Sequence, residues 1–374
     1  MYVLARFLTH ASLLLLSGCA GSLAEGLRAG DPGAERPILE SGWTLPLYEL
    51  GPVPWFPQDF GRGMVVDEVL YVGAGDGSVR AIRESGEVLW TARTGEAVVA
   101  RPVVDGEHVL VASMDGHLRS LSRQTGVVEW EYDCGGAIRS EPTLDGGRVF
   151  FSNERNEIHA LDAVTGKYLW HKRRSHRTEF TITGTSSPAV AQGKVLVGFS
   201  DGAFLALAPE DGTTGYNVKL GAIADRFTDV DTHPVVRDGV VYVASFRGGM
   251  HALRVEDGKE LWSQRVEGAT TPVLTGDALH FGTSNHEVVC LDRMTGAVRW
   301  RTRFTTGMPG EPVLAGRWLL VTTDEKLAVL EVDTGRVRET WPLLNGIAAT
   351  PMVGRHGVYV VSNRGALHAW RWAR

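Results

Sequence analysis

The stretch Ile158-His-Ala-Leu-Asp-Ala-Val-Thr-Gly-Lys-Tyr-Leu-Trp170 contains an apolar run, an Asp/Thr/Gly turn and a second run that reaches a tryptophan. This order of residues is typical of a β-hairpin, whose turn needs residues that tolerate a positive φ. The same spacing of turn glycine and tryptophan returns along most of the chain. The sequence therefore predicts a repeated unit built around such a hairpin.

The turn glycine recurs in seven copies: Gly86, Gly126, Gly166, Gly212, Gly258, Gly296 and Gly335. A tryptophan lies four residues after the glycine in five copies: Trp90, Trp130, Trp170, Trp262 and Trp300. The other two copies carry Tyr216 and Glu339 at that position. A tryptophan is large enough to fill the wedge between two repeats, so we expect it to pack one copy against the next.

A second landmark, a proline that opens an apolar strand, precedes each hairpin. It occurs at Pro102, Pro142, Pro188, Pro234, Pro272, Pro312 and Pro351, with Gly63 in its place in the first copy. The landmarks are 38 to 40 residues apart, except for two successive spacings of 46. Such spacing fits four short strands per copy, and no segment shows the apolar period of a helix. We predict an all-β fold, an eight-bladed β-propeller with four antiparallel strands per blade.

The last copy lacks its fourth strand, because the chain ends at Arg374 soon after the strand Gly365-Ala-Leu-His-Ala-Trp370. A closed ring must cover its last strand edges. Trp43-Thr-Leu-Pro-Leu47, ahead of the first copy, has the composition of a fourth strand that bears tryptophan. We predict that this N-terminal strand completes the last blade.

The N-terminus carries Arg6, the apolar run Ala11–Leu16 and then Ser17-Gly18-Cys19, which is typical of a secretory signal and is too short for a membrane helix. Leu16-Ser-Gly-Cys19 also resembles the lipobox of bacterial lipoproteins, in which the cysteine is acylated. The alternative is a plain secretory signal that ends near a cysteine. We expect a signal peptide over 1–18, a lipidated Cys19 with a flexible tether over 19–40, and the propeller over 41–374.

Composition limits the kind of partner. The chain has 374 residues, 43% hydrophobic and 22% charged, with a net charge of −6. This balance is typical of a globular protein and argues against a nucleic-acid partner, which would normally require a basic face. Apart from Cys19, only Cys134 and Cys290 remain, in copies far apart, so we expect no disulfide. Cys290 replaces an alanine of other copies and is expected to be buried.

The two long spacings place extra residues after two successive fourth strands, in the segments 172–185 and 221–231. Connections of this type emerge on the same rim of a propeller, so the two loops should form one patch. The first loop offers Phe180 and Ile182, and the second offers Asp229 and Asp231, a combination suited to protein binding. The alternative is that the apolar pair packs inward and that the acids cap turns or pair with Arg226.

The segment Asp225-Arg-Phe-Thr-Asp-Val-Asp-Thr-His-Pro-Val-Val236 resembles the corresponding part of the BamB family of lipoproteins of the outer-membrane β-barrel assembly machinery. The resemblance implies a monomeric, non-enzymatic scaffold within a complex, lipid-anchored at the outer membrane and facing the periplasm. In that family the two loops bind POTRA domains of the barrel-inserting subunit. By position, Phe180, Ile182, Asp229 and Asp231 match the binding residues. The family's arginine falls on Thr183; Arg226 or Arg177 could supply the charge instead, or the partner contact could be reduced.

Enzymatic roles fit less well. Quinoprotein dehydrogenases resemble this chain in their repeats but carry an adjacent cysteine pair, calcium ligands and a catalytic acid, and no adjacent cysteines occur here. His159, His251 and His368 share one position of the third strand, but they belong to different blades and cannot converge on one metal ion. We therefore predict no catalytic residue, metal or cofactor. The alternatives are a propeller with another envelope scaffold role or, less favoured, a quinone-dependent dehydrogenase.

Overall fold

The computed structural model describes residues 36–48, 61–174, 186–220, 229–343 and 346–374. Ile38–Arg374 forms one compact unit, and the strands β1 to β32 all lie within it. Every helix or strand assigned in these ranges is a β-strand. The described ranges contain no helix of the length and apolarity that a membrane crossing requires.

The strands form eight four-stranded sheets, which are the blades of a ring. Blade 1 consists of β2 (Gly63–Val66), β3 (Val69–Gly73), β4 (Ser78–Arg83) and β5 (Val88–Arg93), and blade 2 of β6 (Val103–Asp105), β7 (His108–Ala112), β8 (His117–Ser122) and β9 (Val128–Asp133). Blade 3 consists of β10 (Thr143–Asp145), β11 (Arg148–Asn153), β12 (Glu157–Asp162) and β13 (Tyr168–Arg173), and blade 4 of β14 (Ala189–Ala191), β15 (Lys194–Gly198), β16 (Ala203–Leu207) and β17 (Thr214–Lys219). Blade 5 consists of β18 (Val235–Arg237), β19 (Val240–Ser245), β20 (Gly249–Arg254) and β21 (Glu260–Gln264), and blade 6 of β22 (Val273–Thr275), β23 (Ala278–Gly282), β24 (Glu287–Asp292) and β25 (Val298–Arg303). Blade 7 consists of β26 (Val313–Ala315), β27 (Trp318–Thr322), β28 (Lys326–Glu331) and β29 (Val337–Pro342), and blade 8 of β30 (Met352–Val353), β31 (Gly357–Val361), β32 (Ala366–Trp372) and β1 (Leu39–Pro46).

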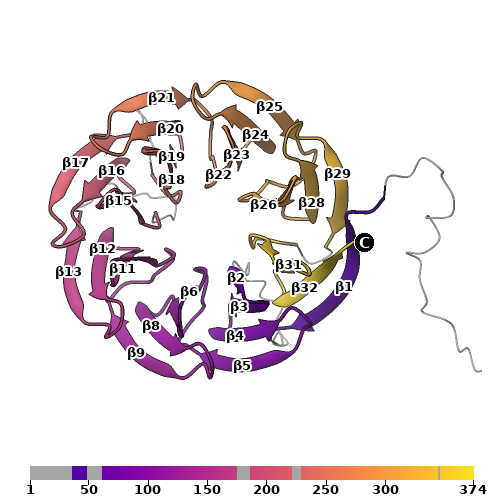
Figure 1. Ribbon diagram of the computed structural model, residues 1–374, viewed down its shortest axis with the longest axis horizontal. Coiled ribbons are helices and arrows are strands. Elements are labelled where there is room, and N and C mark those ends of the chain that lie inside the picture. Colours follow the sequence, from indigo (N-terminus) through magenta and orange to yellow (C-terminus); the bar gives the residue numbers. More distant parts are fainter. Residues whose placement is uncertain (1–35, 49–60, 175–185, 221–228, 344–345) are drawn as a thin grey trace, which may run out of the picture. The chain divides into compact units, whose positions relative to one another are not determined.

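Each blade is an antiparallel meander whose first strand lies nearest the centre of the ring and whose fourth strand lies at the periphery (Figure 1). The second and third strands are almost fully buried, as β16 shows along its whole length. The fourth strands alternate between exposed and covered side chains, as in β13. The predicted eight-bladed propeller of four antiparallel strands per blade is confirmed.

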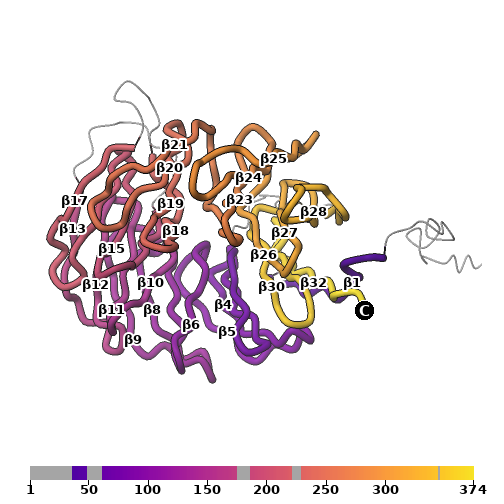
Figure 2. Tube along the Cα trace, turned by 45° about the horizontal axis from the view of Figure 1, so that its top comes forward, coloured from indigo at the N-terminus to yellow at the C-terminus, as the bar shows by residue number. Residues whose placement is uncertain are grey.

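The ring closes with strands from distant parts of the sequence. β1 pairs antiparallel with β32, from Leu39 opposite Trp372 to Pro46 opposite Ala366, and Figure 2 shows the two strands side by side. The predicted completion of the last blade by the N-terminal strand is therefore confirmed. β1 begins at Leu39, two residues before the expected start of the propeller at 41.

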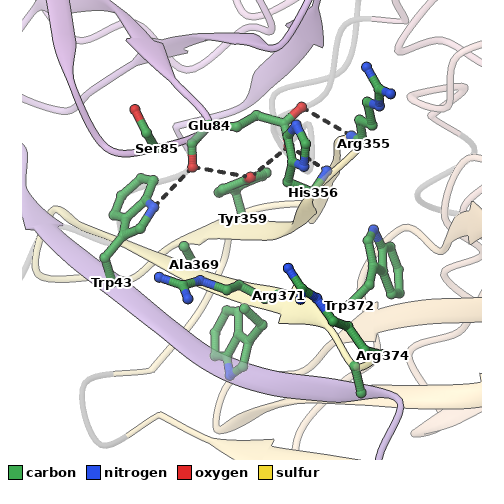
Figure 3. Close-up of a pocket in the computed structure, with 12 residues that line it drawn as sticks. Trp43, Glu84, Ser85, Arg355, His356, Tyr359, Ala369, Arg371, Trp372 and Arg374 are labelled. Carbon is green, nitrogen blue, oxygen red and sulfur yellow. Dashed lines mark hydrogen bonds between the residues drawn. The ribbon is translucent and has the colours of Figure 1, made fainter.

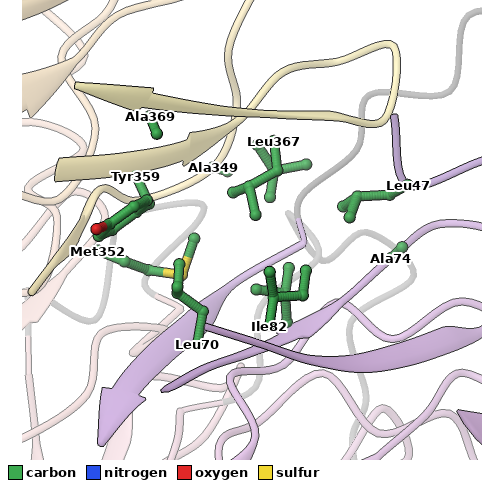
Figure 4. Packing of buried hydrophobic residues seen from close by; sticks show 11 residues of the cluster. Leu47, Leu70, Ala74, Ile82, Ala349, Met352, Tyr359, Leu367 and Ala369 are labelled. Atoms are coloured by element: carbon green, nitrogen blue, oxygen red, sulfur yellow. The ribbon is translucent and has the colours of Figure 1, made fainter. Parts of the chain in front are cut away.

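We call the boundary between blade 8 and blade 1 the seam. An apolar cluster fills it, in which Leu47 and Leu367 of blade 8 face Leu70 and Ile82 of blade 1, with Met352 beside them (Figure 4). These side chains are at most 3% exposed. Burial of this kind contributes about 25 cal/mol per Å² of apolar surface, so the seam is held by hydrophobic packing like the interior of a blade.

The recurring tryptophan joins neighbouring blades in the way that the repeat predicts. Trp90 of β5 donates its indole N–H to the carbonyl oxygen of Arg123 in blade 2 at 2.8 Å. A Cβ on Gly126 would stand 2.6 Å from the Trp90 ring, and the φ of this glycine is +73°. The turn glycine is therefore needed both for its backbone conformation and for the close approach of the preceding blade's tryptophan. Tyr216 packs on Gly258 in the same way.

Glu339 replaces the tryptophan where the ring needs a different contact. Its carboxylate accepts the backbone N–H groups of Ile38 at 2.6 Å and of Leu39 at 3.1 Å. Blade 8 has no hairpin turn between its third and fourth strands, because β32 and β1 are far apart in the sequence, and so it offers no turn glycine to a tryptophan of blade 7. The carboxylate instead binds the start of the closing strand.

Glu84 of blade 1 holds the opposite side of blade 8 (Figure 3). Its carboxylate accepts N–H groups from Arg355 at 3.0 Å and His356 at 2.7 Å, and the Tyr359 hydroxyl at 2.8 Å. Its backbone carbonyl accepts the Trp43 indole N–H at 3.0 Å. These groups line a groove of about 570 Å³ between blades 8 and 1. The seam therefore combines apolar packing with a largely buried carboxylate clasp.

Candidate partner-binding site

The predicted site lies partly in the described residues. Phe180, Ile182, Thr183 and Arg226 fall outside them, as does Cys19, whereas Asp229 and Asp231 fall within. The structure therefore bears on the bases of the two long loops and on the acidic pair.

The two loops leave their blades at one shared turn. Arg174, the last residue described at the start of the first loop, donates from Nε and Nη2 to the Asp201 carboxylate at 3.1 and 2.6 Å. Lys219, at the end of β17 and just before the second loop, donates to the carbonyl oxygen of the same Asp201. Leu220 donates its N–H to Gly202 at 2.8 Å. The turn between β15 and β16 thus holds both loop starts next to each other.

The two loops also return to the ring side by side. Ser186, the first described residue after the first loop, donates its hydroxyl to the Thr232 carbonyl oxygen at 2.8 Å. Thr232 in turn is fixed to blade 5, because its Oγ1 accepts the Ala244 N–H at 2.9 Å. Both ends of the first loop therefore lie against elements that hold the second, on the rim of blades 3 to 5.

The acidic segment is anchored by the valine between its two acids. Val230 is fully buried in an apolar cluster of blades 4 and 5. Its side chain packs directly on Gly198, where any Cβ would collide with it. The backbone adds two bonds, from Val230 N–H to Phe199 at 3.2 Å and from Phe246 N–H to Asp229 at 2.9 Å. This part of the second loop is therefore a fixed part of the ring.

The two acids differ in exposure. Asp229 is 1% exposed, and Asp231 is partly exposed. Burial, together with the nearby charge of Asp229, raises the pKa of Asp231 to about 6. A carboxylate in this setting is stabilised by a cation brought to it, and Asp231 is the more accessible of the two acids.

A cluster of charged side chains lies near the axis of the ring, on the same rim, and was not predicted from the sequence. Four residues that directly precede the first-strand landmarks form it: Arg62, Arg101, Glu141 and Glu311. We call these four residues the axial cluster. They line a pocket of about 260 Å³ whose walls include Val65, Val313 and Met352. Aligning the residue before each landmark would have revealed that it is charged in several copies.

The other residues considered for chemistry remain apart. His159, His251 and His368 lie on β12, β20 and β32 of three different blades. Cys134 and Cys290 are both free thiols, and Cys290 is 1% exposed, as expected for a small buried residue. Within the described ranges, no group of three or more His, Cys, Asp or Glu side chains is placed to hold a metal ion.

Comparison with known proteins identifies the family. A family model described as outer membrane protein assembly factor BamB matches residues 49–135 and 75–302. Among curated proteins, the BamB of Legionella pneumophila (strain Paris) is 27% identical over 194 residues, 50% of this chain and 50% of that protein. The BamB of Escherichia coli K12 is 27% identical over 163 residues, 42% of each chain. The matched part of the chain spans about half the length of the first of these relatives and less of the second.

Solved structures show the same fold. BamB from Moraxella catarrhalis superposes with a TM-score of 0.74 at 19% identity, covering 90% of this chain and 99% of that one. The quinohemoprotein alcohol dehydrogenase from Comamonas testosteroni gives a TM-score of 0.72 at 16% identity, covering 90% and 77%. At such identities, structural likeness establishes the fold and not the activity. The family model covers more than half of the chain, and this protein therefore belongs to the family of the outer membrane protein assembly factor BamB.

Proposed function

We propose that this protein is a non-enzymatic scaffold of the outer-membrane β-barrel assembly machinery. It binds POTRA domains of the barrel-inserting subunit through the loops 172–185 and 221–231, which we call the rim site. The proposal is supported by one observation above all, the pairing of the two loop bases through Asp201 at one end and through Ser186 and Thr232 at the other. A rigid ring that presents two adjacent loop bases suits a protein partner.

Within the rim site, Phe180 and Ile182 are the apolar anchors, and Asp229 and Asp231 form the acidic part. Thr183 stands where relatives are expected to have an arginine, so Arg226 supplies the positive charge. Asp231 receives a cation of the partner, because its burial beside Asp229 leaves its ionised form in need of a counter-charge.

The anchors are tested by co-purification of the partner with a Phe180→Ala/Ile182→Ala variant. Truncation of an interface anchor typically costs about 1–3 kcal/mol, so we expect recovery of the partner to fall as affinity drops by about 5- to 150-fold. The control is Met308→Ala. Met308 is 54% exposed in the short connection from β25 to β26, on the same rim but outside both loops. Equal recovery with the double variant and the parent would exclude Phe180 and Ile182 as anchors and would leave the family assignment unchanged.

We also propose that residues 1–18 are removed as a signal peptide and that acylated Cys19 anchors the ring to the outer membrane on its periplasmic side. A Cys19→Ser variant should then move from the membrane fraction to the soluble periplasmic fraction, because two or more acyl chains are needed for durable attachment. The variant should still bind the partner in detergent extracts. Retention of Cys19→Ser in the membrane fraction of cells that lack the partner would contradict the anchor.

A dehydrogenase role is the alternative, since a quinohemoprotein shares the fold. It predicts turnover of an alcohol by the purified protein when quinone and calcium are added. Turnover above that of heat-denatured protein would overturn the non-enzymatic scaffold.

A further inference from the structure

The axial cluster connects blades that are not neighbours. Arg62 precedes β2 of blade 1 and contacts the Glu311 carboxylate, ahead of β26 of blade 7, at 3.3 Å. Blade 8 lies between these two blades, and its first strand, β30, has only two residues. At the inner rim, the Arg62–Glu311 contact therefore spans blade 8 beside its first strand, which is shorter than the first strands of the other blades.

Two carboxylates share Arg62. Its Nη1 also contacts Glu141 of blade 3 at 3.1 Å, and Glu141 is bound by Arg101 of blade 2 at 2.6 Å. His233 of blade 5 is close enough to act on Glu141 through its charge. Glu141 thus faces two guanidinium groups, whereas Glu311 depends on Arg62 for its direct ion pair. The two carboxylates are not equivalent.

The surroundings separate their proton affinities. Burial raises the pKa of Glu311, and the charge of Glu141 adds to the effect against the opposing attraction of Arg62 and Arg101. Burial also acts on Glu141, but the charges of Arg101 and Arg62 outweigh it and hold the pKa of Glu141 below its usual value. Glu311 is therefore the first carboxylate of the cluster to take up a proton as the pH falls.

We propose that the axial cluster links blade 1 to blade 7 across blade 8 and that uptake of a proton releases this link. We call the Arg62–Glu311 contact the latch. Arg62 links blade 1 to blade 7 when Glu311 is ionised. Uptake of a proton from solvent by the Glu311 carboxylate removes the attraction to Arg62, which stays bound to Glu141. The link between blades 1 and 7 is then lost while the links among blades 1, 2 and 3 remain.

The latch has an unusual thermodynamic sign. A carboxyl whose pKa is higher in the folded than in the unfolded protein destabilises the fold when it ionises. The contribution of Glu311 to the free energy of unfolding should therefore fall as the pH rises from 4.5, the ordinary value for glutamate, through the raised pKa of Glu311. An ordinary salt bridge between Arg62 and Glu311 would give the opposite trend.

The test is the pH dependence of urea unfolding for the parent and a Glu311→Gln variant, whose uncharged amide mimics the protonated carboxyl. At pH 8 the unfolding constant of the variant should be lower than that of the parent, by about tenfold if the folded pKa lies one unit above the unfolded value. The difference should shrink to about twofold at pH 4.5 and vanish below it, where the carboxyl is protonated in both states. In the parent, the protection of β30 and β31 amides from hydrogen exchange should fall as the pH drops and the link across blade 8 is lost. In the variant it should not change with pH.

The matched control is Glu331→Gln in the same blade. Glu331 pairs with Arg338 away from the axis, and hydrogen bonds from Thr334 and Arg338 lower its pKa, so its neutralisation should weaken the fold at pH 8 and have no effect in acid. The latch is overturned if Glu311→Gln follows the trend of Glu331→Gln, if its effect is independent of pH, or if the carboxyl carbon resonance of Glu311 titrates below 4.5.

Discussion

Replacing Glu84 by alanine should lower the free energy of unfolding by about 3–5 kcal/mol, the typical loss when one partner of a buried polar network is removed. The Glu84 side chain is 7% exposed, and its carboxylate accepts three donors from blade 8, the N–H groups of Arg355 and His356 and the Tyr359 hydroxyl. Alanine leaves the two N–H groups without their acceptor and leaves the Tyr359 hydroxyl with only the longer contact, of 3.4 Å, to the backbone carbonyl oxygen of residue 84. The loss should appear as a lower urea midpoint with an unchanged slope.

The control is Arg123→Ala, at the same position of the repeat in blade 2. Arg123 also reaches back to the preceding blade, where it binds Asp67 and the Tyr71 hydroxyl. Asp67 is 76% exposed, so its charge remains solvated when the arginine is removed, and we expect a loss of about 1 kcal/mol. Equal losses in the two variants would mean that the seam is no more dependent on its clasp than any other blade boundary.

The sequence predicted the ring because each of its signals is local. The glycine and the tryptophan that closes on it lie in adjacent repeats, so both recur with the period of the repeat. Trp43 carried enough of that pattern to identify a fourth strand about 320 residues away from its partner β32. The adjacency of the two loop bases, at Asp201 and at Ser186 and Thr232, followed from topology alone, since connections of one type share a rim.

Contacts made only when the ring closes were not predicted. Glu339 looked like a defect in the repeat, and its role became clear only when Ile38 and Leu39 were found at its carboxylate. Arg62, Glu141 and Glu311 are unremarkable charges in the sequence, because nothing local indicates that three blades bring them together. The axial charges share one position of the repeat, but the sequence does not show which of them pair, because the pairing depends on how the closed ring brings the blades together.

The acidic loop shows a different limit. In Asp229-Val-Asp231 the polar residues flank an apolar one, which in an exposed loop favours two solvated acids. Val230 instead occupies the space above Gly198, and this anchoring takes Asp229 to 1% exposure. The degree of burial of this segment depends on a glycine in the neighbouring blade, which the local pattern of residues does not reveal.

Replacing Gly126 by alanine should lower the free energy of unfolding by about 2–5 kcal/mol. Part of the loss, about 1–2 kcal/mol, arises because an L-residue adopts a φ of +73° with difficulty. The rest arises because the new Cβ would stand 2.6 Å from the ring of Trp90, which is only 8% exposed and is held by its bond to Arg123. Displacing a packed ring in this way costs about 1–3 kcal/mol.

Gly147→Ala separates the two contributions. Gly147 has a φ of +76°, close to that of Gly126, but a Cβ there would meet no atom within 4 Å. It should therefore show the backbone cost alone, and the difference between the two variants in urea unfolding measures the contact between the tryptophan of one blade and the turn of the next. If both alanines have the same effect, the glycine is required only for its backbone conformation. The recurrence of tryptophan four residues after five of the seven turn glycines would then need a cause other than packing between blades.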